Sequence, residues 1–385
     1  MPIGSDKGFF VKPGFDPLGE MTSTPVALPN GAIWSWGKND NGQVGKNNIL
    51  GSYSSPVQIG ALTTWATTSP GGQFSLARKT DGTLWAWGLN NRGQLATNDT
   101  TSYSSPIQVG ALTNWLEICA GYAHILTRKA DGTLWVWGWD YKGMLGIGTL
   151  GGKSSPVQVG ALTTWSKVSA GYSHSLATTT SNELYAWGYN YSGNLGTGNT
   201  TDYSSPVQVG SLTNWLTISA GMYVSAAIKT DGTLWTWGWN VYGQLGDGTT
   251  ADKSSPIQIG ALTTWSKLAT GIHTTYAIKT DGTLWTWGYG QNGRLGHGNT
   301  TNYSSPVQVG GLTTWSDIFA GEAFAIGVTT GGALWSWGQG TSGKLGLGST
   351  TSYSSPVQIG ALETWNTELP KSGFTKGTPV IMKEA

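Results

Sequence analysis

The chain has 385 residues and a net charge of +1, and only 11% of its residues are charged. This balance supplies no basic face for nucleic acid and no strong attraction to acidic lipid. There is neither an apolar run of about 18 residues nor a charged-then-apolar leader. We therefore expect no nucleic-acid partner, no membrane partner and no signal peptide, with synthesis in the cytoplasm.

The N-terminal segment, residues 1–22, fits none of the repeats found further along the chain. It is rich in Gly and Pro but carries several apolar residues: Phe9, Phe10, Phe15 and Leu18. Each such side chain gains roughly 1.5 to 3 kcal/mol when it is buried, so a solvated linker would seldom expose so many. We expect residues 1–22 to be an attachment tail covered by a protein partner.

From residue 23 onward the chain repeats every fifty residues. The string KTDGTLWTWG stands at 229–238 and again at 279–288. Seven copies of an aromatic-x-Trp element share this period: Trp34/Trp36, Trp85/Trp87, Trp135/Trp137, Tyr185/Trp187, Trp235/Trp237, Trp285/Trp287 and Trp335/Trp337. A Ser-Ser-Pro element and a further Trp recur seven times in the same register, from Pro56 to Pro356 and from Trp65 to Trp365. A period near fifty indicates a solenoid or a propeller.

Each unit reads as four short strands with no room for a helix, which favours a propeller blade. In one unit the expected strands are 265–270, 274–279, 283–288 and 305–309. The Asp-Gly pair between the second and third strands predicts a two-residue turn with positive φ angles. Proline cannot donate to a ladder, so the Ser-Ser-Pro strand is expected at the outer edge and the strand opening at Trp265 beside a central channel.

Six complete units run from Trp65 to Gly360, and the seventh is split between the chain ends. Its outer three strands are expected at 24–28, 32–37 and 55–59, and its inner strand at 364–369. Pairing these segments would close the ring and remove its open edges. The sequence thus predicts an all-β, seven-bladed propeller over residues 23–370, closed by N- and C-terminal strands.

Residues 371–385 lie beyond this count and are expected to form a C-terminal tail. This segment carries Phe374 and Ile381 among its apolar residues. By the same burial argument we expect it to contact the partner that covers residues 1–22.

Several motifs resemble the repeat of the regulator of chromosome condensation family. They are DGTLWTWG at 231–238, GQLGDG at 243–248, the SSPVQ strand and AGYSHSLA at 170–177. The resemblance covers nearly the whole chain and implies a seven-bladed propeller. Exchange factors in that family use an inserted wedge, for which the unbroken fifty-residue register leaves no place. The paired glycines of the kelch propeller are not the pattern here.

Residues for chemistry are sparse. His124 and His174 occupy equivalent positions in adjacent units, where a role in tying strands together is the simpler interpretation, and the remaining two histidines have no ligand set nearby. The Asp that recurs in four of the hairpins, at 81, 131, 231 and 281, is explained by its turn. GIGTLG at 146–151 is a blade loop and opens no helix. We therefore expect no catalytic residue, no metal site and no cofactor, and not an enzyme.

The variable loop after each Trp-Gly is the main difference among the units. Aromatic residues gather there in the second to fifth complete units, and we take six of them as candidate partner contacts: Trp139, Tyr141, Tyr189, Tyr191, Trp239 and Tyr242. Exposed Trp and Tyr are enriched where partners bind. Packing of these rings on neighbouring blades is the simpler alternative, and the sequence leaves both open.

The sequence favours a non-enzymatic structural or interaction protein, a rigid propeller mounted on a larger assembly such as a virion or other surface assembly. Near-identical copies without insertions resemble the repeat proteins of bacteria and their phages. Two alternatives stay open. One is a regulatory propeller of the small-GTPase exchange and chromatin type, and the other is a propeller that binds a glycan through its aromatic loops.

Overall fold

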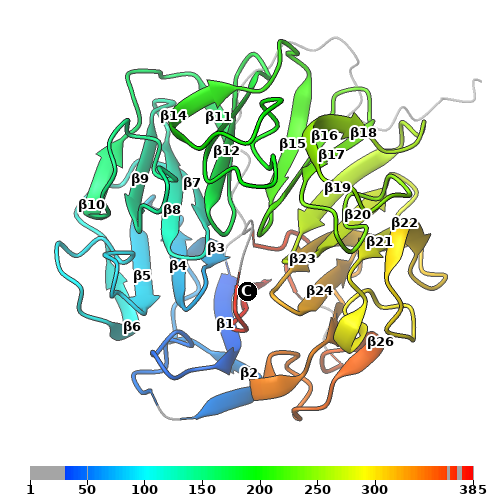
Figure 1. The fold of residues 1–385 in the computed structure, drawn as a ribbon. Coiled ribbons are helices and arrows are strands. Elements are labelled where there is room, and N and C mark those ends of the chain that lie inside the picture. The colour runs from blue at the N-terminus through cyan, green and yellow to red at the C-terminus, as the bar shows by residue number, and fades with distance from the viewer. Residues whose placement is uncertain (1–30, 50, 362–364, 371–374, 385) are drawn as a thin grey trace, which may run out of the picture.

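Each fifty-residue unit folds into a four-stranded antiparallel blade, because its Gly-rich turns cut it into short strands. The computed structural model describes residues 31–49, 51–361, 365–370 and 375–384. In Figure 1 the blades follow one another around a central channel. No helix in these ranges is long and apolar enough to cross a membrane.

The six complete blades share one strand order from the channel outward. Innermost are β3 (Trp65–Pro70), β7 (Trp115–Ala120), β11 (Trp165–Ala170), β15 (Trp215–Ala220), β19 (Trp265–Thr270) and β23 (Trp315–Ala320). Second are β4 (Phe74–Lys79), β8 (His124–Lys129), β12 (His174–Thr179), β16 (Val224–Lys229), β20 (Thr274–Lys279) and β24 (Phe324–Thr329). Third are β5 (Leu84–Gly88), β9 (Leu134–Gly138), β13 (Leu184–Gly188), β17 (Leu234–Gly238), β21 (Leu284–Gly288) and β25 (Leu334–Gly338). Outermost are β6 (Tyr103–Gln108), β10 (Lys153–Gln158), β14 (Tyr203–Gln208), β18 (Lys253–Gln258), β22 (Tyr303–Gln308) and β26 (Tyr353–Gln358).

Two short 3₁₀ turns, η1 (Gln291–Gly293) and η2 (Thr341–Gly343), lie in loops of the fifth and sixth blades. The Ser-Ser-Pro strands are outermost, as predicted, and the strands that open with Trp line the channel. The seven-bladed all-β propeller predicted from the sequence is confirmed.

The hairpin between the second and third strands differs from the two-residue turn expected. Lys229 N donates to Thr233 O at 3.0 Å, which leaves a three-residue loop, and Gly232 takes the left-handed φ of 76°. Asp231 serves instead as an acceptor, taking bonds from the Thr233 amide at 3.0 Å and its hydroxyl at 2.6 Å. The aspartate is therefore explained by hydrogen bonding, and the positive φ belongs to the next position, which is Gly232 here and Asn182 in the third blade.

Consecutive blades are joined by the same bonds at every seam. At the outer rim the amide of one loop donates to a serine carbonyl of the next blade in all seven seams, from Asn47 N to Ser104 O through to Gly348 N to Ser54 O. Deeper in, the fully buried Trp237 donates its indole N–H to Asn194 O at 3.0 Å, and five other seams repeat that bond. In the seam between the fourth and fifth blades, Thr275 Oγ1 bonds Gln244 O instead.

The seventh blade is assembled differently from the expectation. Strand β27 (Val380–Glu384) pairs antiparallel with β1 (Gly31–Lys38), which pairs on its other side with β2 (Ser52–Gln58). Trp365 bridges Lys383 and so places the innermost segment. The N-terminal end thus supplies β1 and β2, and the C-terminal end supplies β27 and the bridging segment at Trp365. The predicted second strand at 24–28, which lies outside the described residues, is not needed to complete the blade.

The expected C-terminal tail over 371–385 is accordingly wrong for its last part. Val380 and Ile381 are at most 1% exposed, and Ile381 packs in a cluster with Trp36, Phe324 and Trp365. These apolar side chains are covered by the ring itself and not by a partner. Ile381 is a core residue and not a contact for a partner.

Replacing Ile381 by Ala should therefore lower the free energy of unfolding by about 2 to 4 kcal/mol, the usual cost of truncating a buried large aliphatic side chain. Leu212→Ala is the matched control, because Leu212 is 45% exposed in a connector. Chemical denaturation compares the two. Equal losses for both variants would show that 380–384 is not part of the ring.

His124 and His174 bind across seams, in line with the structural interpretation. Their Nε2 atoms lie 3.0 Å from Ser175 Oγ and 2.9 Å from Ser225 Oγ. Each serine hydroxyl already donates to a backbone carbonyl, Met144 O or Asn194 O, so each histidine must donate from Nε2. Burial lowers the pKa of each histidine to about 3.

Because the pKa of both histidines is lower in the folded protein than in the unfolded chain, the unfolded chain binds more protons as the pH falls below about 6.5. Stability contributed by the neutral forms should be lost from there toward pH 3. When the pH falls from about 7 to about 5, we expect each histidine to lower the free energy of unfolding by on the order of 2 kcal/mol.

The variant His124→Phe/His174→Phe should lose less stability over that range, since Phe74 and Phe324 fill the equivalent positions in other blades. Melting temperatures of both proteins across the range provide the measurement. An acid-induced fall of the same size in both proteins would contradict the assignment.

Candidate functional site

The loops that vary among the units share one face of the ring. Because adjacent strands in a blade are antiparallel, the loop after the first strand and the loop after the third leave at the same end. Backbone bonds join these two loops in each of the six complete blades, for example from Trp139 N to Ala123 O at 2.8 Å and from Trp239 N to Tyr223 O at 2.9 Å. Side chains from both loops therefore meet on this face.

The loops after the first strands form a collar around the channel mouth. Tyr122 N donates to Gly171 O and Tyr172 N to Gly221 O, each at 3.1 Å, and most neighbouring loops repeat the pattern. The seventh blade joins the collar, since Glu322 N donates to Thr375 O and Lys376 N donates to Gly72 O. Lys376 thus occupies the place that Tyr122 and Tyr172 hold in their own blades.

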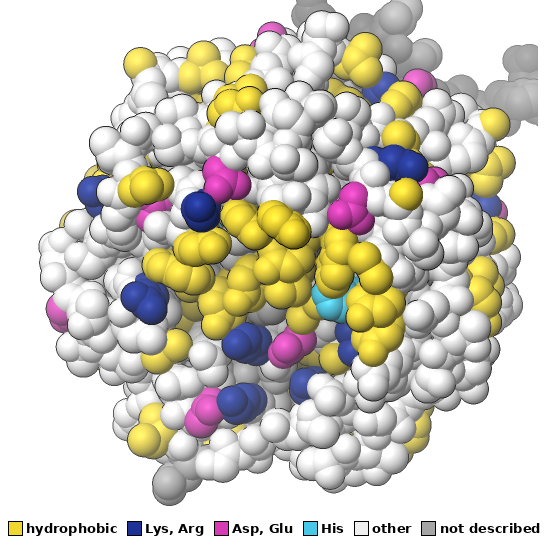
Figure 2. Space-filling view, in the orientation of Figure 1, with side chains coloured by type: hydrophobic (Ala, Val, Ile, Leu, Met, Phe, Trp, Pro, Cys, Tyr) yellow, Lys and Arg dark blue, Asp and Glu magenta, His cyan; other side chains and the backbone are white. Residues whose placement is uncertain are grey.

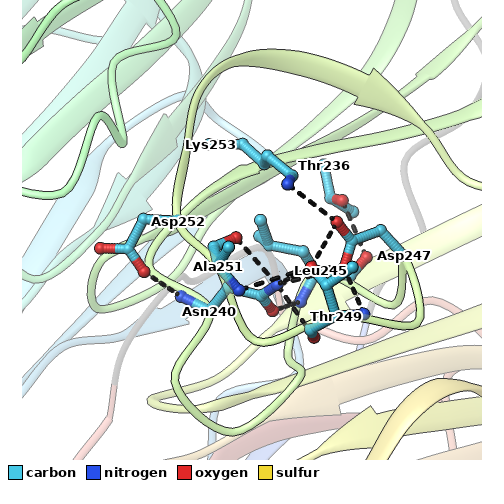
Figure 3. A network of polar contacts seen from close by, with 8 residues as sticks. All are labelled: Thr236, Asn240, Leu245, Asp247, Thr249, Ala251, Asp252 and Lys253. Atoms are coloured by element: carbon cyan, nitrogen blue, oxygen red, sulfur yellow. Dashed lines mark hydrogen bonds and ion pairs between the residues drawn. The ribbon is translucent and has the colours of Figure 1, made fainter.

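The loops after the third strands are held by buried polar residues. Figure 3 shows Asn240 at the base of one such loop. Its side chain accepts from Leu245 N at 2.9 Å and donates to the carbonyls of Thr249 and Ala251 at 3.1 Å. Asp247 pairs with Lys253 at 3.4 Å in the same network. Such internal bonding fixes the loop, and with it the aromatic side chains at its start.

These two sets of loops bring eleven rings into one surface, which we call the aromatic arc: Tyr122, Trp139, Tyr141, Tyr172, Tyr189, Tyr191, Tyr223, Trp239, Tyr242, His273 and Tyr289. Neighbouring ring centroids lie between 4.3 Å (Tyr242 to Tyr289) and 6.3 Å (Tyr122 to Trp139) apart. In Figure 2 hydrophobic side chains form a continuous band across this face beside the channel mouth.

The loop aromatics pack on one another, as the simpler alternative has it, while their contact with a partner stays a prediction. The rings pack on one another within and between blades, yet all eleven keep some exposure. Tyr191 is 75% exposed and Tyr141 40%. The arc is therefore preorganised by its own packing and still offers ring surface to a partner.

The arc carries no charge near neutral pH. Burial, followed by the neighbouring Tyr122, raises the pKa of Tyr172 to about 12, and burial also raises the pKa of Tyr223. Burial, with the nearby Arg294, lowers the pKa of His273 to about 4, so its imidazole is neutral. The surface offers aromatic faces, phenol hydroxyls and a neutral imidazole.

Cations border the arc. Arg92 lies over the ring of Trp139 at 5.4 Å, Lys376 over Tyr122 at 4.8 Å and Arg294 over Tyr289 at 5.0 Å. The Lys376 ammonium also donates to the Tyr122 hydroxyl at 3.2 Å. Contacts of this kind hold the cations against the rings.

All six loop aromatics predicted as partner contacts lie in the arc. Of the predicted tail contacts, Ile381 is in the core, and the others lie outside the described residues: Phe9, Phe10, Phe15, Leu18 and Phe374. The sequence interpretation missed Tyr122, Tyr172, Tyr223 and His273 as members. Their signal was available, because they stand at the variable positions after each first strand, which share a face with the other loops.

The channel has fewer features of a binding site than the aromatic arc. Its wall is built by the innermost strands around a cavity of about 380 Å³, and Glu117 pairs there with Arg128 at 3.5 Å. Burial raises the pKa of Glu117 against the opposing effect of Arg128. Within the described ranges, no three His, Cys, Asp or Glu side chains are grouped so that they could hold a metal ion.

Seven consecutive matches to the regulator of chromosome condensation (RCC1) repeat cover residues 30–78, 81–127, 131–178, 181–228, 231–278, 281–328 and 331–366. The chain belongs to the RCC1 repeat family. The repeat boundaries fall in the turns between the second and third strands, and the blades combine halves of consecutive repeats. This offset is what splits the seventh blade between the chain ends.

Solved structures of this fold include human WBSCR16, with a TM-score of 0.80, 20% identity and coverage of 92% of this chain and 99% of the other. Prp20p of Saccharomyces cerevisiae, described with its binding to Gsp1p and histones, gives 0.80 at 19% identity, covering 93% and 92%. Yeast RCC1 (Prp20) bound to Kap60 gives 0.83 at 17% identity, covering 99% and 96%. At these identities the likeness shows the fold alone.

Two curated human proteins match in part. The probable E3 ubiquitin-protein ligase HERC3 is 36% identical over 72 residues, which is 18% of this chain and 7% of HERC3. HERC6 is 39% identical over 66 residues, which is 17% of this chain and 6% of HERC6. The matched stretch thus spans a small fraction of either relative.

Proposed function

We propose that this propeller is a non-enzymatic binding module that docks a protein partner on its aromatic arc. The observation that carries the proposal is an unbroken series of partly exposed rings across four blades, fixed by the collar and by the loop networks. Trp and Tyr dominate protein interfaces because they bury large areas at a low cost in side-chain entropy. The fold supports this use, since Prp20 is described as binding protein partners.

The test removes exposed ring surface without disturbing the blades. Tyr141→Ala/Tyr191→Ala deletes two exposed side chains of the arc. The control is Leu162→Ala/Leu212→Ala, which deletes two exposed side chains in connectors at the opposite end of the strands. Both variants should melt close to the unaltered protein, because all four side chains are at least 39% exposed.

Affinity purification with quantitative mass spectrometry from the native source should recover a protein that the arc variant binds at least about tenfold less, while the control retains it. A partner retained equally by both variants would place binding elsewhere. If the recovered partner is a small GTPase, a nucleotide-release assay then separates simple docking from the exchange-factor alternative.

The setting in a larger assembly, such as a virion, is a further part of the proposal and depends on residues 1–22. Its support is the apolar content of that segment, Phe9, Phe10, Phe15 and Leu18. Residues 375–384 belong to the ring and so do not supply the attachment expected of a C-terminal tail. Phe374 lies outside the described residues, and attachment is proposed for residues 1–22.

A protein lacking residues 1–22 should keep the melting temperature of the full chain but lose incorporation into particles prepared from the native source. The triple variant Phe9→Ser/Phe10→Ser/Phe15→Ser should behave in the same way. Undiminished occupancy of either protein would move attachment to the blades.

A further inference from the structure

One end of the aromatic arc is hollowed between the first and second blades. The hollow measures about 180 Å³, and its walls include Tyr122, Trp139, Tyr172 and Arg92, with Gln73 and Gln94 beside them. Tyr122 and Tyr172 stack with centroids 4.4 Å apart, and Trp139 meets Tyr122 edge-on at 6.3 Å. Three aromatic walls around a space of this size suit one large planar or apolar side chain.

The loops fix these walls before any ligand arrives. Trp139 N donates to Ala123 O, and Tyr122 N and Tyr172 N are held in the collar. The amide of Arg92 donates to Gln94 Oε1 at 2.7 Å, which positions the backbone from which the guanidinium extends. A rigid pocket of this kind binds without a large ordering cost.

The charged side chain that lines the hollow is a cation, and the carboxylate of Glu322, in the collar, makes only a minor contribution to the raised pKa of Tyr172. Arg92 is exposed, and its guanidinium lies over Trp139 without an ion pair or a side-chain hydrogen bond to any described residue. Lys376 lies over Tyr122 on another side. No Asp or Glu is among the lining residues. The five donors of an arginine match a carboxylate in a two-point contact, so the hollow complements an anionic group beside its apolar occupant.

We infer that this hollow is a subsite for an acidic segment of the protein partner, in which one aromatic side chain enters between Tyr122, Trp139 and Tyr172 while a neighbouring carboxylate pairs with Arg92. The inference rests on the proposed function and names the chemistry of the partner. The few residues that carry most of the binding energy in protein interfaces are enriched in Trp, Tyr and Arg. An aromatic anchor beside an ion pair between Arg92 and a carboxylate is a combination of this kind.

The sequence of the loops offers a matched control. Lys142 stands fifty residues after Arg92, in the equivalent loop of the second blade, but its ammonium pairs with Asp202 at 3.4 Å. Lys142→Gln and Arg92→Gln remove the same charge from the same face. Only Arg92→Gln removes the cation that lines the hollow.

The test uses defined peptides, so it does not need the native partner. Fluorescein-labelled peptides with a central Trp flanked by Asp, by Asn or by Lys, and an Asp peptide with Ala at the centre, are titrated with the full chain and read by anisotropy. We expect the Asp-flanked Trp peptide to bind most tightly. Arg92→Gln should weaken it about tenfold and Lys142→Gln hardly at all. Added salt should weaken binding to the unaltered protein and to Lys142→Gln more than to Arg92→Gln.

The inference is overturned if the Asn- or Lys-flanked peptides bind equally well, if Arg92→Gln leaves affinity unchanged, or if no peptide binds. A neutral oligosaccharide that binds this face independently of Arg92 would overturn it as well, and would assign the hollow to a glycan. Any of these results overturns only the acidic subsite. If the variant Tyr141→Ala/Tyr191→Ala also loses the native partner, the proposed docking on the aromatic arc is still supported.

Discussion

Closure of the ring is the constraint on which the rest of this structure depends. A four-stranded blade has two apolar faces to bury, and here each blade packs both faces against its neighbours, while its edge strands lie at the channel and at the outer rim. Every seam uses the outer-rim backbone bond, and all but one add an indole N–H to carbonyl bond at the Trp237-type position. The closing seam is no exception, since Trp36 donates to Lys344 O and Gly348 N to Ser54 O. One missing blade would therefore uncover two faces, each lined by large apolar side chains.

Closure of the ring also determines which side chains lie on the face that carries the aromatic arc. The collar at the channel mouth includes the seventh blade only because Thr375 and Lys376 take the loop position that Tyr122 and Tyr172 hold elsewhere. The same C-terminal residues that complete the core thus place a lysine beside the aromatic arc. With the blades fixed against one another, rings contributed by different blades keep constant spacing, and a surface spread over four blades acts as one rigid platform.

Much of the fold could be predicted from the sequence, because the Trp registers and the Ser-Ser-Pro strands repeat every fifty residues, with a single extra residue in the first unit. The second strand of the seventh blade could not, because Val380–Glu384 has no Trp and no turn signal of the repeat, and its pairing with β1 depends on tertiary contact alone. The sequence predicted only part of the aromatic arc. Trp139 and Tyr189 stood out as aromatic loop residues, whereas Tyr223 and His273 become members only once the antiparallel order brings two loops to one face.

The most direct measurement of this account is amide hydrogen exchange along the C-terminal segment of the full chain. If residues 375–384 complete the seventh blade, the amides of β27 should exchange as slowly as those of β8 and β12, the equivalent strands in other blades, and the Lys376 amide should be protected like that of Tyr172. Fast exchange across 375–384, with the six complete blades still protected, would contradict closure by these residues and with it the placement of Lys376 at the arc.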